Sequence, residues 1–400
     1  MTVTAPSGVT RAELAPRHAE IVRATLPLIG ERIEDITREF YRRMFAAHPE
    51  LIRNLFNRGN QAQGAQQRAL AASIATFATH LVDPALPHPA EMLSRIAHKH
   101  VSLGVTADQY RIVYEHLFAA IAAVLGPDTV TPEVAEAWDR VYWIMADVLI
   151  DLERSLYDEA GLAAGDVFRR ARVTERVDDP SGAVLLTVHP LGADFSNFRP
   201  GQYISVGVTL PDGARQLRQY SLVGAPGSAE LSFAVRPAGE VSNWIAEHVR
   251  VGDLVDVTAP FGDLPTPTAG APLVLVSAGI GVTPMLGILA HLAETAPATP
   301  VRALHADRDV RSHPLRDRQR ALLERLPNAT LDLWYEDPTG AAGARAGLLD
   351  LDDVDLPAGA EVYLCGGTGF VQAVRGALLG RGVPAERVHC ELFTPNDWLV

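Results

Sequence analysis

The strongest constraint on the fold is that the spacing of apolar residues changes twice along this 400-residue chain. Between about residues 11 and 158, apolar side chains recur every three or four positions, which is typical of helices. From about residue 167 to 267 the apolar runs are short and separated by Gly, Pro and Asp turns, which predicts an antiparallel β-barrel. From residue 272 strands alternate with helices, which predicts a parallel sheet covered on both faces.

The length is more than one hydrophobic core supports, so we expect several domains. The fold class that the pattern predicts is multidomain: an all-α domain, then an antiparallel β-barrel domain, then an α/β domain with a parallel sheet. We place a disordered N-terminal arm at residues 1–10, the helical domain at 11–160, the barrel at 161–268 and the α/β domain at 269–400.

Composition excludes several kinds of partner. The formal charge is −13 and there is no basic tract, which argues against binding to nucleic acid. No stretch reaches the roughly 18 apolar residues that a membrane span needs, and the first nine residues lack the pattern of a signal peptide. The two cysteines, Cys365 and Cys390, cannot form a disulfide framework. We therefore expect a cytoplasmic protein; its oligomeric state is open, with a monomer as one expectation.

Two ionisable residues of the helical region fall on apolar faces. His100 ends a stripe of apolar residues at four-residue spacing, whereas His98 is expected on the solvated side. A histidine in such a place is more often a core residue than a ligand. Glu153 also continues an apolar stripe, where a carboxylate is costly unless it is paired. The alternative for Glu153 is a surface carboxylate near the domain junction.

Several segments of the helical region, taken together, resemble the globin domain of bacterial flavohaemoglobins. Their order and spacing match that family in Phe40–Phe45, His48–Leu51, Leu55–Asn57, Gln66–Leu70 and Ile96–His100. The resemblance extends over nearly the whole chain. It implies a globin fold, an FAD-binding barrel and an NAD(P)-binding domain.

The resemblance gives the helical residues their roles. It implies that His100 ligates the haem iron, that Tyr41 and Gln66 face the oxygen ligand, that Leu70 shapes that pocket and that Phe56 packs on the porphyrin. Taken singly, Tyr41 and Phe56 could be core aromatics and Gln66 a surface amide.

The resemblance also makes Tyr110 and Glu153 the partners of His100. A carboxylate that accepts the ring N–H raises the basicity of the imidazole and fixes its orientation. A more electron-rich axial ligand supports reductive activation of oxygen.

The segment Arg218–Ser221, which we expect to follow a strand, resembles the flavin motif of the ferredoxin–NADP reductase superfamily. The resemblance implies that Arg218 binds the pyrophosphate, that the ring of Tyr220 lies on the isoalloxazine and that Ser221 binds the flavin edge. Ser242 is the expected N-cap of a helix whose N-terminus suits a diphosphate. The chain departs from the family at Arg236–Ala238, where a more basic pair is expected. The predicted flavin-binding residues are Tyr203, Arg218, Gln219, Tyr220, Ser221, Gly239, Val241, Ser242 and Phe393.

Phe393 has two interpretations, an aromatic ring that covers the flavin face or a buried strand residue, and the sequence does not separate them.

Two glycine-containing loops, each after a predicted strand, resemble the nicotinamide loops of the same superfamily. In the first, Gly279 and Gly281 would let the backbone approach a phosphate closely, and Pro284 suits a first helical turn. In the second, we interpret Cys365 as a small residue beside the nicotinamide, because no nearby base would activate it as a nucleophile. The predicted residues of the two loops are Gly279, Gly281, Val282, Thr283, Pro284, Cys365 and Gly366.

The resemblance implies a nitric oxide dioxygenase that converts NO and O2 to nitrate with electrons from NAD(P)H, through FAD and haem b, and so detoxifies NO. Two alternatives are a haem-dependent hydroperoxide reductase and an oxygen-binding redox sensor or store. A complete reductase half argues against storage, and Tyr41 with Gln66 and the Tyr110–Glu153 pair favour dioxygenation.

The choice between NADH and NADPH stays open. Arg308 and Arg311 could meet a 2′-phosphate, whereas the neighbouring Asp307 and Asp309 would oppose it, and the resemblance slightly favours NADH.

Overall fold

The computed structural model describes residues 13–54, 56, 58, 64–86, 88–268 and 270–393. The predicted arm at residues 1–10 lies outside the described residues, as do Leu55 and Asn57. The main division of the chain falls between Val167, which ends a helical part, and Phe168, which begins the first strand.

The first part is built from helices, as predicted. They are α1 (Pro16–Ala47), α2 (Pro49–Asn54), α4 (Ala65–Val82), the 3-10 turn η1 (Pro89–Met92), α5 (Ser94–Val101), α6 (Gln109–Leu125) and α7 (Pro132–Glu159). Proline occupies the first position of α1, α2 and α7. Backbone N–H groups in a first helical turn make no hydrogen bond within the helix, so the N–H that proline lacks is not needed there. Thr131 caps α7 by accepting a hydrogen bond from the Val134 N–H at 3.4 Å.

One apolar core fills the helical part. Ile36, Phe40 and Met44 of α1, predicted as an inward stripe, are all fully buried in it. The prediction for His98 is wrong, because only 6% of this residue is exposed. His98 shares its buried face of α5 with Ala97 and Val101, and α5 packs on α7.

The second part begins with an antiparallel sheet whose strand order is β4-β3-β6-β1-β2-β5. Its elements are β1 (Phe168–Asp178), β2 (Val184–Pro190), β3 (Tyr203–Thr209), β4 (Arg215–Ser221), β5 (Leu231–Val235), helix α8 (Glu240–His248) and β6 (Leu254–Thr258). The segment Arg218–Ser221 forms the last four residues of β4 and does not follow a strand, which corrects the prediction.

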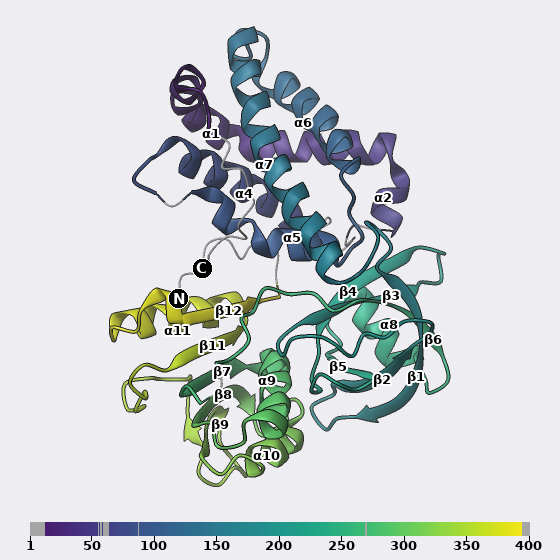
Figure 1. Ribbon diagram of the computed structural model, residues 1–400, viewed down its shortest axis with the longest axis vertical. Coiled ribbons are helices and arrows are strands. Elements are labelled where there is room, and N and C mark those ends of the chain that lie inside the picture. The colour runs from purple at the N-terminus through teal and green to yellow at the C-terminus, as the bar shows by residue number, and fades with distance from the viewer. Residues whose placement is uncertain are drawn as a thin grey trace. The chain divides into compact units, whose positions relative to one another are not determined.

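A parallel sheet with the order β10-β9-β8-β7-β11-β12 completes the chain. Helices α9 and α10 cover one face of this sheet and α11 covers the other (Figure 1). The elements are β7 (Leu273–Ala278), η2 (Gly279–Gly281), α9 (Val282–Thr295), β8 (Val301–Asp309), α10 (Arg316–Glu324), β9 (Ala329–Asp337), β10 (Arg345–Ala346), β11 (Glu361–Gly366), α11 (Thr368–Gly380), η3 (Ala385–Arg387) and β12 (Val388–Leu392). The predicted fold class, helical then antiparallel then parallel α/β, is confirmed.

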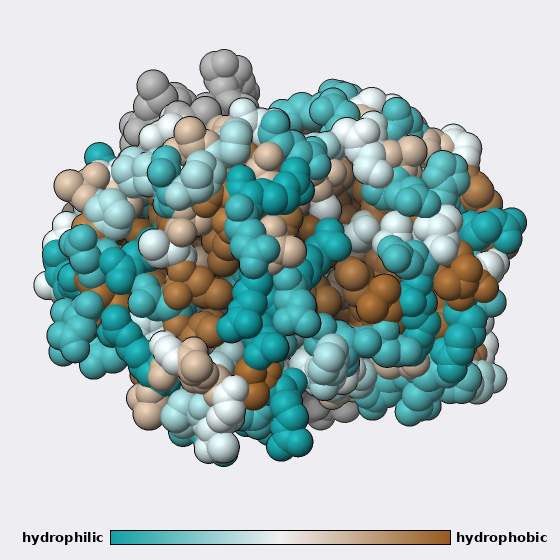
Figure 2. Space-filling model, turned by 90° about the horizontal axis from the view of Figure 1, so that it is seen from below, coloured by the Kyte–Doolittle hydropathy of each residue, from teal (hydrophilic) through white to brown (hydrophobic). Residues whose placement is uncertain are grey.

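Within the described ranges, no helix combines the length and the apolar character that crossing a bilayer requires. Figure 2 shows one face of the molecule, where hydrophilic residues predominate and apolar residues form small separate patches.

Candidate functional site

Three ionisable side chains that the sequence singled out meet inside the helical part. His100 of α5 places its Nδ1 atom 2.7 Å from Glu153 Oε1 of α7 and 3.0 Å from the hydroxyl of Tyr110 of α6. The Tyr110 hydroxyl donates to the same Oε1 atom at 2.5 Å. Glu153 is only 3% exposed, so the interpretation as a surface carboxylate is wrong.

The protons of this cluster follow from its geometry. Glu153 accepts at one oxygen from two donors, so His100 must carry its ring proton on Nδ1. Burial, and then the charge of Glu153, raise the pKa of Tyr110, which keeps its phenol protonated as a donor. The other ring nitrogen, Nε2, therefore carries no proton, and an unprotonated imidazole nitrogen is the form that binds a metal ion. An imidazole with a carboxylate on Nδ1 is a donor suited to haem iron.

The residues predicted for the opposite side of a haem come from α1, from α4 and from the segment after α2. Tyr41 is buried, with its ring 5.5 Å from that of Phe45 and 6.0 Å from that of Phe56. The structure thus brings two predicted residues, Tyr41 and Phe56, into one aromatic group. Gln66 and Leu70 lie one turn apart on α4, both half-buried.

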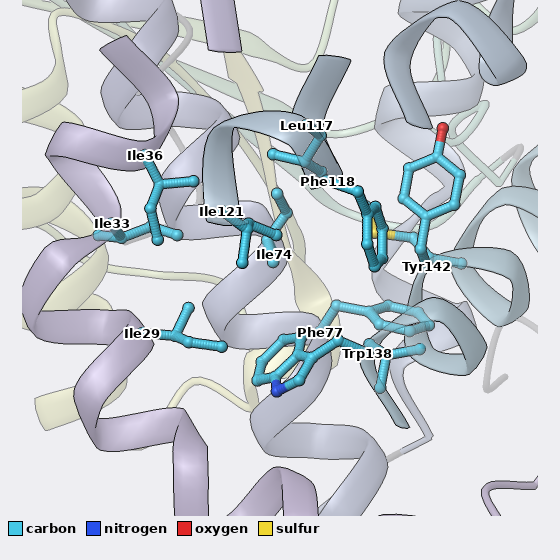
Figure 3. Close-up of a pocket in the computed structure, with 12 residues that line it drawn as sticks. Ile29, Ile33, Ile36, Ile74, Phe77, Leu117, Phe118, Ile121, Trp138 and Tyr142 are labelled. Atoms are coloured by element: carbon cyan, nitrogen blue, oxygen red, sulfur yellow. The ribbon is translucent and has the colours of Figure 1, made fainter. Parts of the chain in front are cut away.

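An apolar pocket lies deeper in the helical part, between residues of α1, α4, α6 and α7 (Figure 3). None of the predicted site residues lines it; the lining side chains are Ile29, Ile33, Ile36, Ile74, Phe77, Leu117, Phe118, Ile121, Trp138, Val141, Tyr142 and Met145. Helical spacing marks most of these residues as inward-facing, but it does not distinguish a pocket wall from a filled core.

The end of β4 presents two buried polar atoms, the Tyr220 hydroxyl and Ser221 Oγ. Neither atom has a hydrogen-bond partner among the residues that the structure describes. Buried polar atoms are normally satisfied, so these two indicate a ligand or water at this strand. The ring of Tyr220 stacks on Phe233 of β5 at 5.4 Å, and burial raises the pKa of its hydroxyl.

Neighbouring residues support this strand end. Gln219 Nε2 donates to Ser205 Oγ of β3 at 2.9 Å, and Arg218 is half-buried beside Tyr220. Tyr203 is buried at the start of β3. A flavin has the flat ring and polar edge that this combination of an aromatic, hydroxyl groups and an arginine can bind. The sequence did not reveal Phe233 or Ser205, because only strand pairing brings them here.

The N-terminus of α8 differs from the prediction in one respect. Gly239 is the N-cap, and Ser242 lies three residues into the helix, where its Oγ accepts from the N–H groups of Ala238 and Gly239 at 3.0 Å each. Ser242 therefore secures the loop that enters the helix, and Val241 is buried beneath it.

The two predicted nicotinamide loops come together at the carboxyl ends of β7 and β11. A Cβ atom added to Gly281 would lie 2.4 Å from the Cys365 carbonyl oxygen, and one added to Gly366 would lie 2.6 Å from the ring of Phe370. Gly279 has φ of 53°, in the left-handed region that favours glycine. The close approach of the two loops therefore requires a glycine at position 281.

Their neighbours pack inside the same domain. Val282, Thr283, Pro284 and Cys365 are all buried, and Thr283 Oγ1 donates to the Ile280 carbonyl at 2.9 Å.

Phe393 directly follows β12 and is 46% exposed. The interpretation as a buried strand residue is wrong, and an exposed aromatic ring suits a planar ligand better.

Comparisons with known proteins match both parts. A globin family model matches residues 38–149, and a model described as an oxidoreductase NAD-binding domain matches residues 275–376. The fold and these sites define a class of protein: a globin followed by FAD/NAD-binding reductase domains.

Relatives extend over almost the full length. The flavohaemoprotein of Bordetella parapertussis is 40% identical over 400 residues, which cover 95% of this chain and 98% of that relative. The crystal structure of flavohaemoglobin from Malassezia yamatoensis with bound FAD and haem matches with a TM-score of 0.87 and 36% identity, covering 96% of this chain and 100% of that one. The FAD/NAD-binding domain of nitric oxide dioxygenase from Vibrio cholerae matches with a TM-score of 0.53 and 32% identity, over 56% of this chain and 98% of that one. This chain belongs to the flavohaemoprotein family.

Proposed function

We propose that this protein binds haem b and FAD and oxidises nitric oxide to nitrate in the cytoplasm, with O2 and NAD(P)H, which removes a toxic gas. The observation that carries the proposal is the hydrogen-bonded set of His100, Glu153 and Tyr110. The Malassezia relative holds both cofactors, and the Vibrio relative is a nitric oxide dioxygenase. The reaction balances as NO + O2 + e− → NO3−, so one hydride from the coenzyme supplies two turnovers.

When bound, haem supplies the iron at which the two gases react, and FAD converts a hydride into single electrons. The residues of the chain bind, orient and polarise. His100 would hold the iron through Nε2. Glu153 keeps the Nδ1 proton in a charge-assisted hydrogen bond, which makes the imidazole a stronger electron donor. Tyr110 donates to the same carboxylate oxygen and keeps it aimed at His100.

The residues on the other side would act on the gases. Tyr41 and Gln66 supply an O–H and an amide N–H, donors that favour a ligand with partial negative charge over a neutral one. Leu70 and Phe56 supply apolar surface that excludes water from the same space.

In the reductase domains, the chain would position flavin and coenzyme. Ser221 and Tyr220, whose buried hydroxyl groups have no partner among the described residues, would donate hydrogen bonds to the flavin, and Arg218 would offset the charge of its pyrophosphate. Gly281 lets the first nicotinamide loop pack directly against the backbone of the second, and Gly366 leaves room for the ring of Phe370. Phe393, whose ring is exposed, would cover the face of the flavin.

The test is NO consumption by the haem- and FAD-loaded full-length protein with NADH, with and without O2. We expect rapid consumption that requires O2. The variant His100→Ala should lose haem and NO consumption while its flavin is still reduced by NADH. Efficient turnover of cumene hydroperoxide without comparable NO consumption would instead support a hydroperoxide reductase. Reversible O2 binding with neither activity would support a sensor.

A further inference from the structure

A row of aromatic side chains begins beside the His100 cluster and runs along α6. Tyr110, Tyr114 and Phe118 follow one another at four-residue spacing, so they lie along one face of the helix. Tyr110 is the residue of this row whose hydroxyl lies 3.0 Å from His100 Nδ1. Each step of four residues advances about 6 Å along the helix axis, so the row leads away from the His100 cluster.

Two aromatic residues of α7 complete this group. The ring centroid of Tyr114 lies 5.3 Å from that of Tyr142 and 5.4 Å from that of Trp143, and the latter two are 5.3 Å apart. The Tyr142 hydroxyl donates to the backbone carbonyl of Tyr110 at 2.5 Å, which links these rings to the residue beside His100. Phe118 packs on Tyr142 with centroids 6.1 Å apart, where both residues border the apolar pocket (Figure 3).

The group extends from the interior of the helical part to its surface. Tyr110 is buried, whereas Tyr142, Tyr114 and Trp143 are half-buried. One end therefore contacts the predicted haem ligand, and the other end is accessible to small molecules in solution.

Two of the three tyrosines donate a hydrogen bond to a carboxylate. The Tyr110 hydroxyl donates to Glu153 Oε1 at 2.5 Å, and the Tyr114 hydroxyl donates to Asp139 Oδ1 at 2.8 Å. Burial raises the pKa of both phenols, so both are protonated in the resting protein. A phenol that loses an electron becomes a strong acid, and a carboxylate at hydrogen-bond distance can take its proton.

The hydroxyl of Tyr142 has a different partner, a backbone carbonyl oxygen, which is too weak a base to hold a proton. Tyr110 and Tyr114 can therefore each retain a neutral radical, whereas Tyr142 can only pass charge between them. Packing alone does not require these residue types, because phenylalanine would fill positions 110 and 114 without a hydroxyl on a carboxylate. Tyrosine and tryptophan can be oxidised by one electron at potentials that phenylalanine does not reach.

We propose that Tyr110, Tyr142, Tyr114 and Trp143 form an electron relay from the surface of the helical part to the haem, which supports peroxidase activity toward small reductants in solution. The relay is an electron entry separate from the reductase domains. The inference rests on the proposed ligation of haem by His100.

The oxidant of this activity is hydrogen peroxide, which is reduced as H2O2 + 2 e− + 2 H+ → 2 H2O. One electron comes from the haem group and is restored through the reductase domains. The other comes from Tyr110, whose proton passes to Glu153. An electron from Tyr114 then reaches Tyr110 through Tyr142; the proton on Glu153 returns to Tyr110, and the proton of Tyr114 passes to Asp139. A reductant such as ascorbate gives up one electron at Tyr114 or Trp143, and Asp139 returns the proton.

The test mixes the haem-loaded full-length protein with hydrogen peroxide and a nitroso spin trap, without NADH, and locates the adducts by peptide mass spectrometry. In the native protein we expect an adduct on Tyr114 that added ascorbate abolishes. Tyr142→Phe should lose this adduct, while freeze-quench electron paramagnetic resonance still shows a tyrosyl radical, on Tyr110. The matched control Tyr157→Phe removes another tyrosine of α7 that donates to a backbone carbonyl, that of Val105 at 2.6 Å, and should keep the adduct.

Asp139→Asn changes the proton acceptor and keeps the size of the side chain. An amide cannot hold the proton, so this variant should also lose the Tyr114 adduct. A native protein that consumes peroxide without an adduct on Tyr114 would overturn the inference, and this measurement needs no variant to fold. An adduct of equal yield in Tyr142→Phe would overturn the relay as well.

Two measurements on the same preparation keep the proposals separate. NO consumption with NADH but no Tyr114 adduct would contradict the relay alone. The adduct without NO consumption would contradict the dioxygenase and leave the relay standing. A haem absorption band that persists in His100→Ala would contradict the ligation on which both proposals rest.

Discussion

Replacing Glu153 with Gln removes one charge from the His100 cluster and keeps the shape of the side chain. Glu153 Oε1 accepts from His100 Nδ1 at 2.7 Å and from the Tyr110 hydroxyl at 2.5 Å, so a single atom serves both donors. A glutamine oxygen can still accept these bonds, but it carries no net negative charge. The change therefore isolates the electrostatic effect of the carboxylate on the imidazole.

The size of the effect follows from the kind of hydrogen bond. A hydrogen bond to a charged group contributes about 1.5–3 kcal/mol and a neutral one about 0.5–1.5 kcal/mol. Removing the charge of Glu153 should therefore weaken its interaction with His100 by about 1–2 kcal/mol. In turnover this corresponds to a decrease of roughly 5- to 30-fold. Because Glu153 is almost fully buried, neutralising it also removes a desolvation penalty. We expect the free energy of unfolding to change by less than about 1 kcal/mol.

The assay combines NO turnover with resonance Raman spectroscopy of the reduced, haem-loaded protein. Glu153→Gln should retain haem, slow turnover and lower the frequency of the iron–histidine stretch. Tyr110→Phe is the control, since it removes one donor and leaves the carboxylate on His100, and it should shift the stretch less. An iron–histidine stretch in Glu153→Gln equal to that of the native protein would refute the reasoning and make the carboxylate structural.

Three further predictions test other parts of the molecule. Tyr41→Phe should speed O2 release from the reduced, haem-loaded protein roughly 10- to 100-fold, while CO release stays nearly constant; equal stopped-flow changes for both gases would indicate lost packing only. Ser221→Ala should weaken FAD binding about 10-fold in fluorescence titration, because the buried hydroxyl has no other partner among the described residues, and unchanged affinity would remove Ser221 from the flavin site. Gly281→Ala should slow flavin reduction by NADH more than about 10-fold, because its Cβ would lie 2.4 Å from the Cys365 carbonyl oxygen. Gly376→Ala, whose Cβ meets nothing within 4 Å, is its control and should preserve the rate; an equal rate in both variants would contradict the close-approach argument.

The spacing of apolar residues predicted those helices and strands that bury an apolar face. The apolar stripes of α1 and α7 and the buried strands β7 and β11 are visible in the sequence because helical and strand periods differ. The inward position of Glu153 followed from the same spacing. Its contact with His100, by contrast, was predicted from the resemblance to a family, because the two residues are far apart in the chain and their spacing says nothing about a contact.

Features that depend on tertiary packing were not predictable in this way. The sequence of β1 is largely charged, and Ala171 and Val173 are its buried residues. It therefore lacks the clear alternation of apolar and polar residues that predicts a strand. His98 is buried on one face of α5 together with Ala97 and Val101, although it lies outside the apolar stripe that ends at His100. The buried position of the Asp307 side chain accompanies a cluster around His305 whose members come from three strands and a loop: Ser277, His305, His313 and Tyr335.

The central claim is that the protein inserts both atoms of O2 into nitric oxide. The most direct measurement is mass spectrometry of the product formed by the haem- and FAD-loaded protein from unlabelled NO, ¹⁸O₂ and NADH. The account predicts nitrate that carries two ¹⁸O atoms, formed only while coenzyme is oxidised. Nitrate with fewer labelled atoms, nitrite as the main product, or coenzyme oxidation without nitrate would contradict it.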